Sequence, residues 1–523
     1  MSFARLSSAQ TEYLRARIVD VEVDLSKGFH AFSIVGLPDK AVEEAKDRIS
    51  AAIKNSGFDS PKSKNQKVVV SLAPADIRKE GPAFDLAIAL CYLAAAKEIT
   101  FDGRNKIFLG ELSLDGILRP IDGVLALVQE AKRKGFTEVY LPQENVKEAA
   151  LIRGISIYGL KSLEQAIAHL HTKDTVGKAE TKRPHTHIPL TPAPETQVET
   201  QNTEREIDWN DIRGQETAKR GLIIAASGGH NIAMWGPPGT GKTMLAKAFA
   251  GILPELSFEE ILEVTSIHSV AGVAKGSLIL TPPIRSPHHT SSYIALVGGG
   301  SSPKPGEITL AHRGVLFLDE FPEFERRVIE ALRQPLEDKI VTVSRAKGSA
   351  TFPADFILIA ALNPCACGNY ESPGKTCTCS PQNIIRYKKK ISGPITDRID
   401  LWTQVGAIDH RKLGASASGQ SSQEIRETVR NARARARERF AGNKRGIRLN
   451  AGMNAKEIEK FAPLNDKTRN ILNASADRMG LSARSYHKII KIARTIADIE
   501  GQENIGAENI GEALQYRPKL TYF

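Results

Sequence analysis

The chain has 523 residues and a mass of 57.0 kDa, which is enough for three or four domains of ordinary size. Hydrophobic residues make up 41% and charged residues 25%, and this composition excludes a wholly disordered chain. The formal net charge of +11 permits an anionic partner such as nucleic acid without requiring one.

The sequence indicates neither export nor membrane insertion. It contains no uncharged apolar stretch of about 18 residues, the length that would span a bilayer. Residues 1–20 lack the apolar core of a signal peptide. Five cysteines are too few for a disulfide framework in a chain of this length. We therefore expect a cytoplasmic protein of a reducing compartment, with no membrane partner.

An alternation of strand and helix patterns predicts an α/β domain over residues 1–171. Runs rich in β-branched residues predict strands at 15–25 and 67–74. Helices are predicted by the amphipathic stretch 39–57, which ends in glycine, and by the more apolar stretch 81–98.

Residues 172–206 are expected to form a flexible linker. The stretch is rich in Thr, Pro, Gln and Glu and has few large apolar residues, so it cannot bury a core of its own. Its two histidines, His185 and His187, are better explained as solvated side chains than as metal ligands.

Two further domains are predicted after the linker. Residues 207–408 show a second alternation of strands and helices, whereas residues 409–523 have helical patterns alone. Ser421 and Glu424 have the spacing of a helix capping box. The expected fold class is therefore a multidomain α/β protein with a helical C-terminal domain.

The strongest motif is GPPGTGKT, which lies between the apolar run NIAMW and a predicted helix. This order of strand, glycine loop and helix is typical of a Walker A motif, whose backbone N–H groups surround phosphates at a helix N-terminus. Lys242 is expected to reach the β- and γ-phosphates and Thr243 to ligate Mg²⁺. The residues expected to bind the nucleotide are Gly236, Pro237, Pro238, Gly239, Thr240, Gly241, Lys242 and Thr243.

A second motif, GVLFLDE at residues 314–320, predicts a buried strand that ends in Asp319 and Glu320. Adjacent residues on a strand point to opposite sides, so their roles should differ. We expect Asp319 to hold Mg²⁺ and Glu320 to polarise the attacking water. Together the two motifs predict the hydrolysis of a nucleoside triphosphate and favour ATP.

Two polar residues follow these motifs in the chain. Asn363 ends the apolar run FILIAAL and is expected to orient the water beside Glu320. Arg398, in ISGPITDRID, is expected to reach the γ-phosphate held by a neighbouring subunit. Each alone is better explained as an ordinary loop asparagine or surface arginine, but their order after the Walker motifs favours catalytic roles.

Longer strings, spread over nearly the whole chain, match one known family. They are FSIVGLPDKAVEEAKDR, VVVSLAPADIRKEGPAFDLAIAL, SPHHTSS, GEITLAHRGVLFLDE, LNPCACG, ISGPITDRIDL and LSARSYHKIIKIARTIADI. With them the chain resembles the magnesium-chelatase-like AAA+ proteins of the ComM/YifB type. The resemblance implies a homohexameric motor with a helical lid, similar to DNA helicases that promote branch migration while transformed single strands are integrated by recombination. It also implies partners: single-stranded and branched DNA, and a recombinase or a single-strand-binding protein.

The resemblance assigns roles to single positions. Asn363 corresponds to sensor 1 and Arg398 to the arginine finger. Arg484, in LSARSYH, corresponds to sensor 2, which can serve its own protomer or the neighbouring one. Residues 209–215, WNDIRGQ, correspond to the entry motif that packs near the adenine.

The resemblance also implies two insertions in the ATPase core. Residues 265–306 correspond to the helix 2 insert and contain the pair His288–His289, for which metal binding is the least favoured reading. Residues 340–354 alternate like a β-hairpin and correspond to the pre-sensor 1 hairpin. Arg345 and Lys347 in this hairpin are expected to contact DNA phosphates in the channel of the hexamer.

The N-terminal domain resembles the Lon-protease-like fold. In that fold a serine nucleophile follows a Gly-Pro pair and a lysine lies further along the chain. Here Ala83 and Leu125 stand at those positions, and neither can act as a nucleophile or a base. We therefore expect a non-proteolytic scaffold.

Four of the five cysteines form a C-x-C-x9-C-x-C pattern, which suits tetrahedral Zn²⁺ in a structural role. A disulfide is the alternative, and it is disfavoured in a reducing compartment. The expected ligands are Cys365, Cys367, Cys377 and Cys379.

The positive charge is concentrated after the Walker motifs. Residues 424–445 hold eight Lys and Arg against three acids, and residues 383–400 hold five against two, which accounts for +5 and +3 of the +11. Charge reversal in these segments is expected to weaken DNA binding and its salt dependence. The alternative function is a magnesium-chelatase-like motor subunit that remodels a protein partner. A binding protein with a vestigial ATPase is disfavoured, because the catalytic set is complete.

Overall fold

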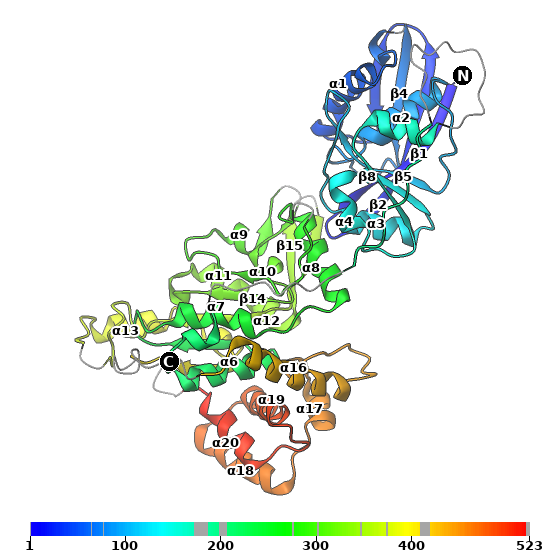
Figure 1. The fold of residues 1–523 in the computed structure, drawn as a ribbon. Helices are drawn as coiled ribbons and strands as arrows, with labels where there is room; N and C mark the ends of the chain where they lie inside the picture. The colour runs from blue at the N-terminus through cyan, green and yellow to red at the C-terminus, as the bar shows by residue number, and fades with distance from the viewer. Residues whose placement is uncertain are drawn as a thin grey trace. The chain divides into compact units, whose positions relative to one another are not determined.

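The computed structural model describes residues 2–63, 65–76, 78–171, 187–197, 207–274, 277–300, 303–345, 348–372, 375–407 and 419–518. The chain forms two compact units (Figure 1). The first unit comprises residues 1–199 and 258–279, and the second unit comprises residues 200–257 and 280–523. Each unit contains a sheet with parallel strands and packed helices, which confirms the α/β fold class. In the residues that the structure describes, no helix is long and apolar enough to cross a membrane.

The first unit is built on a seven-stranded mixed sheet of order β3-β4-β2-β1-β5-β8-β9. Strand β1 is antiparallel to β2 and parallel to β5. The sequence predicted β2 and β4 but not β1, because β1 is poor in β-branched residues. The strands are β1 (Ser2–Glu12), β2 (Arg15–Lys27), β3 (Ala31–Val35), β4 (Gln66–Ala73), β5 (Lys106–Phe108), β8 (Glu138–Pro142) and β9 (Ser156–Leu160), with a separate pair β6 (Glu111–Leu112) and β7 (Leu118–Arg119).

The helices predicted in the first unit are present. Helix α1 begins after Asp39, whose side chain accepts a hydrogen bond from the backbone N–H of Val42. Helix α2 is buried almost all round, which explains why its sequence lacks a polar stripe. The helices of residues 1–171 are α1 (Lys40–Asn55), α2 (Asp85–Ala95), α3 (Val124–Arg133), α4 (Val146–Ala149) and α5 (Leu163–Leu170).

The two positions compared with a protease dyad lie in apolar surroundings. Leu125, on α3, is buried, and Ala83 packs against the same hydrophobic cluster. Neither side chain offers a nucleophile or a base there. The non-proteolytic scaffold role of this unit stays a prediction.

Helix α8 (Phe258–Val270) lies in segment 258–279, which packs in the first unit although the chain before and after this segment belongs to the second unit. The backbone N–H of Gly123, at the start of α3, donates to Oγ of Ser269 at 2.9 Å. Leu262 adds its side chain to the hydrophobic cluster around α3. A segment that the sequence analysis placed in the residue 207–408 core therefore packs with the residue 1–171 domain.

Part of the expected linker is also described. Residues 187–197 run extended along the first unit, where Ala193 N–H donates to the carbonyl of Ile157 at 2.7 Å and Thr196 N–H to that of Ala150 at 3.0 Å. These backbone bonds explain how a stretch without a core of its own is held. Residues 172–186 and 198–206, with His185, lie outside the described residues.

The second unit is built on a parallel sheet of order β11-β14-β17-β10-β18. Every residue of β14 and β17 is buried, as expected for strands covered on both faces. Because the strands are parallel, their carboxyl ends meet at one edge, where ligands bind in such sheets. The strands are β10 (Ile232–Trp235), β11 (Ile284–Arg285), β14 (Val315–Leu318), β17 (Ile357–Leu362) and β18 (Leu401–Gln404).

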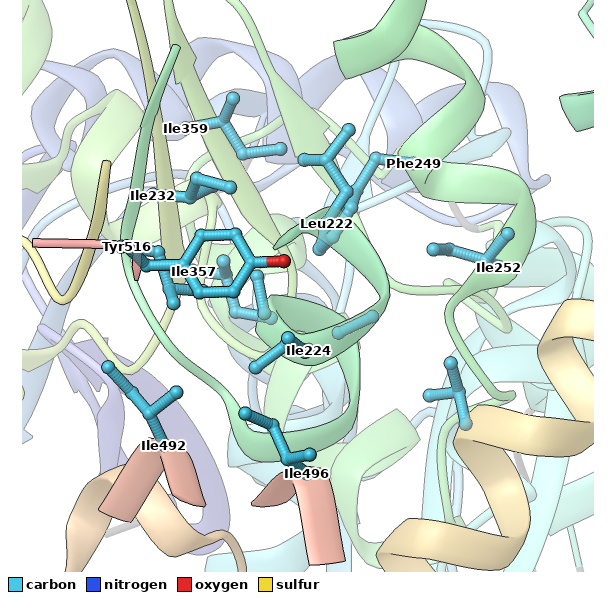
Figure 2. Packing of buried hydrophobic residues seen from close by; sticks show 14 of the residues in the cluster. Leu222, Ile224, Ile232, Phe249, Ile252, Ile357, Ile359, Ile492, Ile496 and Tyr516 are labelled. Carbon is cyan, nitrogen blue, oxygen red and sulfur yellow. The ribbon is translucent and has the colours of Figure 1, made fainter. Parts of the chain in front are cut away.

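One hydrophobic core joins this sheet to the helical C-terminal region. Figure 2 shows Ile232 of β10, Leu222 of α6 (Glu216–Gly228) and Phe249 of α7 (Lys242–Ile252) near Ile496 of α19 (Ala483–Glu500). Burying one such aliphatic side chain is worth about 1.5–3 kcal/mol. The lid is therefore part of the core of the second unit.

The predicted capping box is confirmed at the start of helix α16. Ser421 Oγ accepts from the backbone N–H of Glu424, whose carboxylate accepts from the N–H of Ser421. The other elements of the second unit are α9 (Tyr293–Val297), β12 (Gly298–Gly299), β13 (Lys304–Pro305), α10 (Glu307–Leu310), α11 (Arg326–Ala331), α12 (Arg333–Asp338), β15 (Ile340–Arg345), β16 (Gly348–Pro353), α13 (Pro381–Lys388), α14 (Gly393–Thr396), α16 (Ser422–Arg439), α17 (Ala455–Phe461), α18 (Asp466–Met479) and α20 (Ala507–Gln515).

A buried histidine makes the stability of the second unit depend on pH. His230 is fully buried, its Nε2 lies 2.8 Å from Oγ1 of Thr495, and burial lowers its pKa from 6.5 to about 4. The folded state therefore binds fewer protons than the unfolded state between these values. We expect stability to be complete above pH 6.5 and to fall by about 3 kcal/mol as the pH drops to 4.

Urea unfolding followed by tryptophan fluorescence measures this effect, since Trp209, Trp235 and Trp402 all lie in the second unit. His230→Gln should flatten the fall in stability between pH 6.5 and 4. The matched control is His288→Gln, which changes an exposed histidine. Equal pH slopes for His230→Gln and the unchanged protein would contradict the prediction.

Candidate nucleotide site

The Walker A residues form a loop between β10 and α7 at the carboxyl edge of the sheet. Gly239 and Gly241 have φ angles of +80° and +89°, which favour glycine. A Cβ on Gly236 would lie 2.0 Å from the carbonyl oxygen of Val405, so only glycine fits. The motif therefore has the backbone geometry that brings N–H groups close to phosphates.

Lys242 begins α7 and is buried. Its Nζ donates to the carbonyls of Gly236 and Pro237 at 2.7 and 2.8 Å and to Oδ1 of Asn363 at 3.2 Å. Burial lowers its pKa to about 8, although the charges of Asp319 and Glu320 oppose this. The structure thus brings Lys242 and Asn363 together, while the expected role of Asn363 beside Glu320 stays a prediction.

The residues expected to hold Mg²⁺ are in contact. Oγ1 of Thr243, in the first turn of α7, donates to Oδ2 of Asp319 at 2.8 Å. Asp319 follows β14 directly. A hydroxyl and a carboxylate are the hard oxygen ligands that Mg²⁺ prefers, so the pair fits this ion.

Glu320 sits on a turn, with a φ angle of +50°. Its backbone N–H donates to Oδ1 of Asp319 at 2.9 Å, while its own Oε2 lies 3.3 Å from Nδ1 of His289. The two adjacent carboxylates thus have different partners, in agreement with the different roles expected for them.

His289 was not predicted as part of this site. Its ring lies 4.2 Å from that of His288, whose Nδ1 is bonded to Oγ1 of Thr290. Among the described residues, no group of three or more metal-ligating side chains includes these histidines. No local pattern links His289 to Glu320, because their contact depends on the tertiary fold.

The two arginines expected to act in catalysis, Arg398 and Arg484, meet at one carboxylate. Arg398 forms an ion pair with Glu337 on α12, and Nη2 of Arg484 lies 3.3 Å from Oε1 of the same side chain. Nε of Arg484 also lies 3.7 Å from Oδ2 of Asp397. Burial alone would raise the pKa of Glu337, but the two arginines hold it below its usual value. Sequence reasoning missed Glu337, since acids on helix surfaces are common.

The predicted hairpin is confirmed, because β15 and β16 pair antiparallel from Ile340 opposite Pro353 to Arg345 opposite Gly348. Lys347 lies outside the described residues. Contacts of Arg345 and Lys347 with DNA stay predictions.

The entry motif at residues 209–215 lies against the phosphate loop. Trp209 is buried in the hydrophobic core. Nε2 of Gln215 donates to the carbonyl of Gly406 at 2.6 Å and to that of Thr240, in the loop, at 3.4 Å. The motif thus joins the Walker A loop to the segment after β18.

The four clustered cysteines are brought together and are free thiols. Their Sγ atoms all lie within 4.8 Å of one another, and three of the separations are 3.3, 3.8 and 3.6 Å. With Zn–S bonds of about 2.3 Å, the edge of a tetrahedron is about 3.8 Å. Backbone N–H groups of Asn369 and Thr378 lower the pKa of Cys367 to about 5, whereas contacts with the neighbouring thiols raise the pKa values of Cys377 and Cys379. The donor set fits a structural metal ion.

Comparison with known proteins agrees with this geometry. Family models for magnesium chelatase subunit ChlI match residues 21–145, 208–413 and 419–517, the last with its C-terminal part. The competence protein ComM of Haemophilus influenzae is 41% identical over 520 residues, which are 99% of this chain and 98% of the relative. This chain belongs to the ComM/YifB type of magnesium-chelatase-like AAA+ proteins.

Two other relatives show how much of this ComM/YifB-type protein each similarity covers. YifB of Escherichia coli is 40% identical over 502 residues, 95% of this chain and 94% of the relative. The magnesium-chelatase 67 kDa subunit of Chlorobaculum parvum is 28% identical over 195 residues, which are 35% of this chain and 28% of the subunit. The similarity to ComM and YifB therefore covers both units, whereas that to the chelatase subunit covers about a third of the chain.

Proposed function

We propose that this ComM/YifB-type protein is an ATP-hydrolysing homohexameric motor that acts on single-stranded and branched DNA, as a helicase or in branch migration during recombination of incoming single strands. The observation that supports it best is the joined set of Lys242, Thr243, Asp319, Glu320 and Asn363. This set lies in a chain similar over nearly its whole length to a competence protein.

In the proposed reaction a water oxygen attacks the γ-phosphorus of ATP while the bond to the bridging oxygen of ADP breaks. Glu320 accepts a proton from the attacking water, and Asn363 orients that water. Lys242 offsets negative charge on the phosphate oxygens. Thr243 and Asp319 would hold Mg²⁺, which would supply further positive charge there. Zn²⁺ in the cysteine cluster would have a structural role, because four thiolates complete its coordination.

The shared contact with Glu337 supports a hexamer in which Arg398 and Arg484 act on the neighbour's nucleotide. The guanidinium groups of Arg398 and Arg484 both contact the carboxylate of Glu337, so the two groups lie close together. Their own protomer's phosphate loop is instead served by Lys242 and Asn363. We propose that Arg398 and Arg484 move from Glu337 to the γ-phosphate when subunits assemble.

Several arginines of helix α16 bind groups within the second unit, so fewer residues of this helix are candidates for DNA contact. Arg426, Arg433 and Arg435 donate to the carbonyls of Gly251, Ala226 and Asp498, near the C-terminal ends of α7, α6 and α19. Cations stabilise helix C-termini, so Arg426 and Arg433 hold the lid to the core and Arg435 holds α16 to α19 within the lid. Arg437 on the same helix is exposed and remains a candidate for phosphate contact, with Arg345 and Lys347.

Two alanine variants of α16 separate these roles. Arg433→Ala should lower the free energy of unfolding by about 1–2 kcal/mol, because two hydrogen bonds to a helix end are lost. Arg437→Ala should change stability by less than about 0.5 kcal/mol but reduce the salt slope of DNA binding by about 1. Urea unfolding measures the stability of each variant, and DNA binding at several salt concentrations measures its salt slope. An Arg433→Ala protein as stable as the unchanged one would refute the capping role.

The function is tested by unwinding of a synthetic four-way junction with ATP and Mg²⁺, next to measurement of DNA-stimulated ATP hydrolysis. The control is the Lys242→Ala variant, which should bind or hydrolyse ATP poorly and displace no strand. Hydrolysis without DNA stimulation or strand displacement would reject the DNA motor. It would favour the alternative motor that remodels a protein partner, which the partial similarity to the chelatase subunit supports.

A further inference from the structure

The cysteine loop, residues 365–379, touches the phosphate loop directly. A Cβ on Gly368 would lie 2.6 Å from Cδ and 2.9 Å from Cγ of Pro238, the third residue of the Walker A motif. Gly368 has a φ angle of +77°, and its N–H donates to the carbonyl of Cys365 at 3.0 Å. The turn made by the first two cysteines is therefore pressed against the loop expected to bind phosphates.

A second connection runs through Asn363. Cys365 is buried two residues after Asn363, whose Oδ1 accepts a hydrogen bond from Nζ of Lys242. Tyr387 lies buried on α13, the helix that follows the last cysteine, and lines the same pocket as Asn363 and Tyr370. The segments on both sides of the cysteine loop therefore lie beside the residue that contacts Lys242.

Apart from that of Cys365, the cysteine side chains are little buried in the described part of the loop. Cys365 is buried, whereas Cys367, Cys377 and Cys379 are partly exposed, so hydrophobic packing contributes little. The backbone N–H of Tyr370 donates to Sγ of Cys365 at 3.3 Å, the type of bond that orients a metal ligand. A metal held by four thiolates would fix a loop of this kind, because its binding energy becomes folding energy.

We propose that the metal bound by Cys365, Cys367, Cys377 and Cys379 controls nucleotide affinity by holding Gly368 against Pro238 and Asn363 beside Lys242. The inference rests on the proposed ATP and Zn²⁺ sites and adds a coupling between them. Loss of the metal releases the support on one side of the phosphate loop. The nucleotide site then loses part of its preorganisation, while the residues that contact phosphate stay unchanged.

The first test compares zinc-loaded full-length protein with protein stripped by a chelator under reducing conditions. Zinc is measured by elemental analysis, and affinity by the anisotropy of a fluorescent ADP analogue. Stripping should weaken binding of the analogue at least about 5-fold, and added Zn²⁺ should restore it. Unchanged affinity in stripped protein that had contained zinc would overturn the coupling alone. Protein that binds no zinc would overturn the zinc site and this inference together, while the ATP site could still be tested.

The second test keeps all four ligands. Gly368→Ala should retain one zinc per chain but weaken binding of the ADP analogue at least about 5-fold, because the added Cβ displaces Pro238. The matched control is Gly442→Ala, since Gly442 has nearly the same φ angle, +76°, but a Cβ there meets nothing within 4 Å. Zinc retention with normal affinity in Gly368→Ala would overturn the proposed contact. If both variants bound the ADP analogue weakly, backbone strain would explain the loss, and the proposed contact would be overturned as well.

Discussion

Replacing Glu320 with glutamine is expected to lower the ATP turnover number by at least about 100-fold, while the affinity for ATP changes little. Glutamine has nearly the same shape as glutamate but cannot accept the proton of the attacking water. Thr243, Asp319 and Lys242 keep their contacts, since none of them depends on the Glu320 side chain. Steady-state ATP hydrolysis and the anisotropy of a fluorescent ADP analogue measure the two quantities.

The matched control for this variant is Glu325→Gln, which removes one negative charge from an exposed glutamate close by in the chain. Its turnover number should stay within about 2-fold of the unchanged protein, as for surface changes away from a site. If Glu320→Gln kept full ATPase activity, its role in polarising the water would be refuted.

Replacing Arg398 with alanine is expected to lower ATP turnover by a factor of about 10³ or more, again with nucleotide binding retained. A finger arginine stabilises charge on the γ-phosphate in the transition state and contributes little to the ground state. In the described structure Arg398 lies on Glu337. Its removal therefore leaves the phosphate loop of its own protomer intact.

Mixing two inactive variants tests from which protomer Arg398 acts. An Arg398→Ala protomer has an intact phosphate loop, and a Lys242→Ala protomer has an intact finger. If the finger acts on the neighbour, mixed assemblies should regain part of the ATPase activity. The same mixture with Arg484→Ala assigns the protomer that sensor 2 serves, and Arg478→Ala, an exposed arginine of α18, is the control. No recovery in any Arg398→Ala mixture would contradict action on the neighbour.

Local patterns were sufficient for the parts of the site that are continuous in the chain. The Walker A string needs its glycines because positive φ angles at Gly239 and Gly241 and a close carbonyl at Gly236 exclude side chains. The apolar run of β14 places Asp319 at the edge of a buried strand. Such features depend on neighbouring residues, so residue order alone specifies them.

Charge patterns were less reliable, because a count of arginines does not show their partners. Helix α16 seemed from its composition to be a surface for DNA. In the structure Arg426, Arg433 and Arg435 bind helix C-termini within the second unit instead. A guanidinium group can donate hydrogen bonds to a carbonyl or to a phosphate, and only the fold decides which of them lies near it.

The sequence by itself determined the ATPase motifs, the α/β class, the hairpin and the four-cysteine pattern of this protein. The motifs, the hairpin and the cysteine pattern each depend on spacing within a short segment, and the α/β class depends on the alternation of strand and helix patterns along the chain. The tertiary structure alone decided that His289 contacts Glu320, that Arg398 and Arg484 share Glu337, and that Gly368 rests on Pro238. These contacts join segments that are far apart in the chain. The parallel sheet gathers His289, Glu320, Gly368 and Pro238 because each follows the carboxyl end of a strand, whereas the contact of Arg484 with Glu337 depends on how α19 and α12 pack.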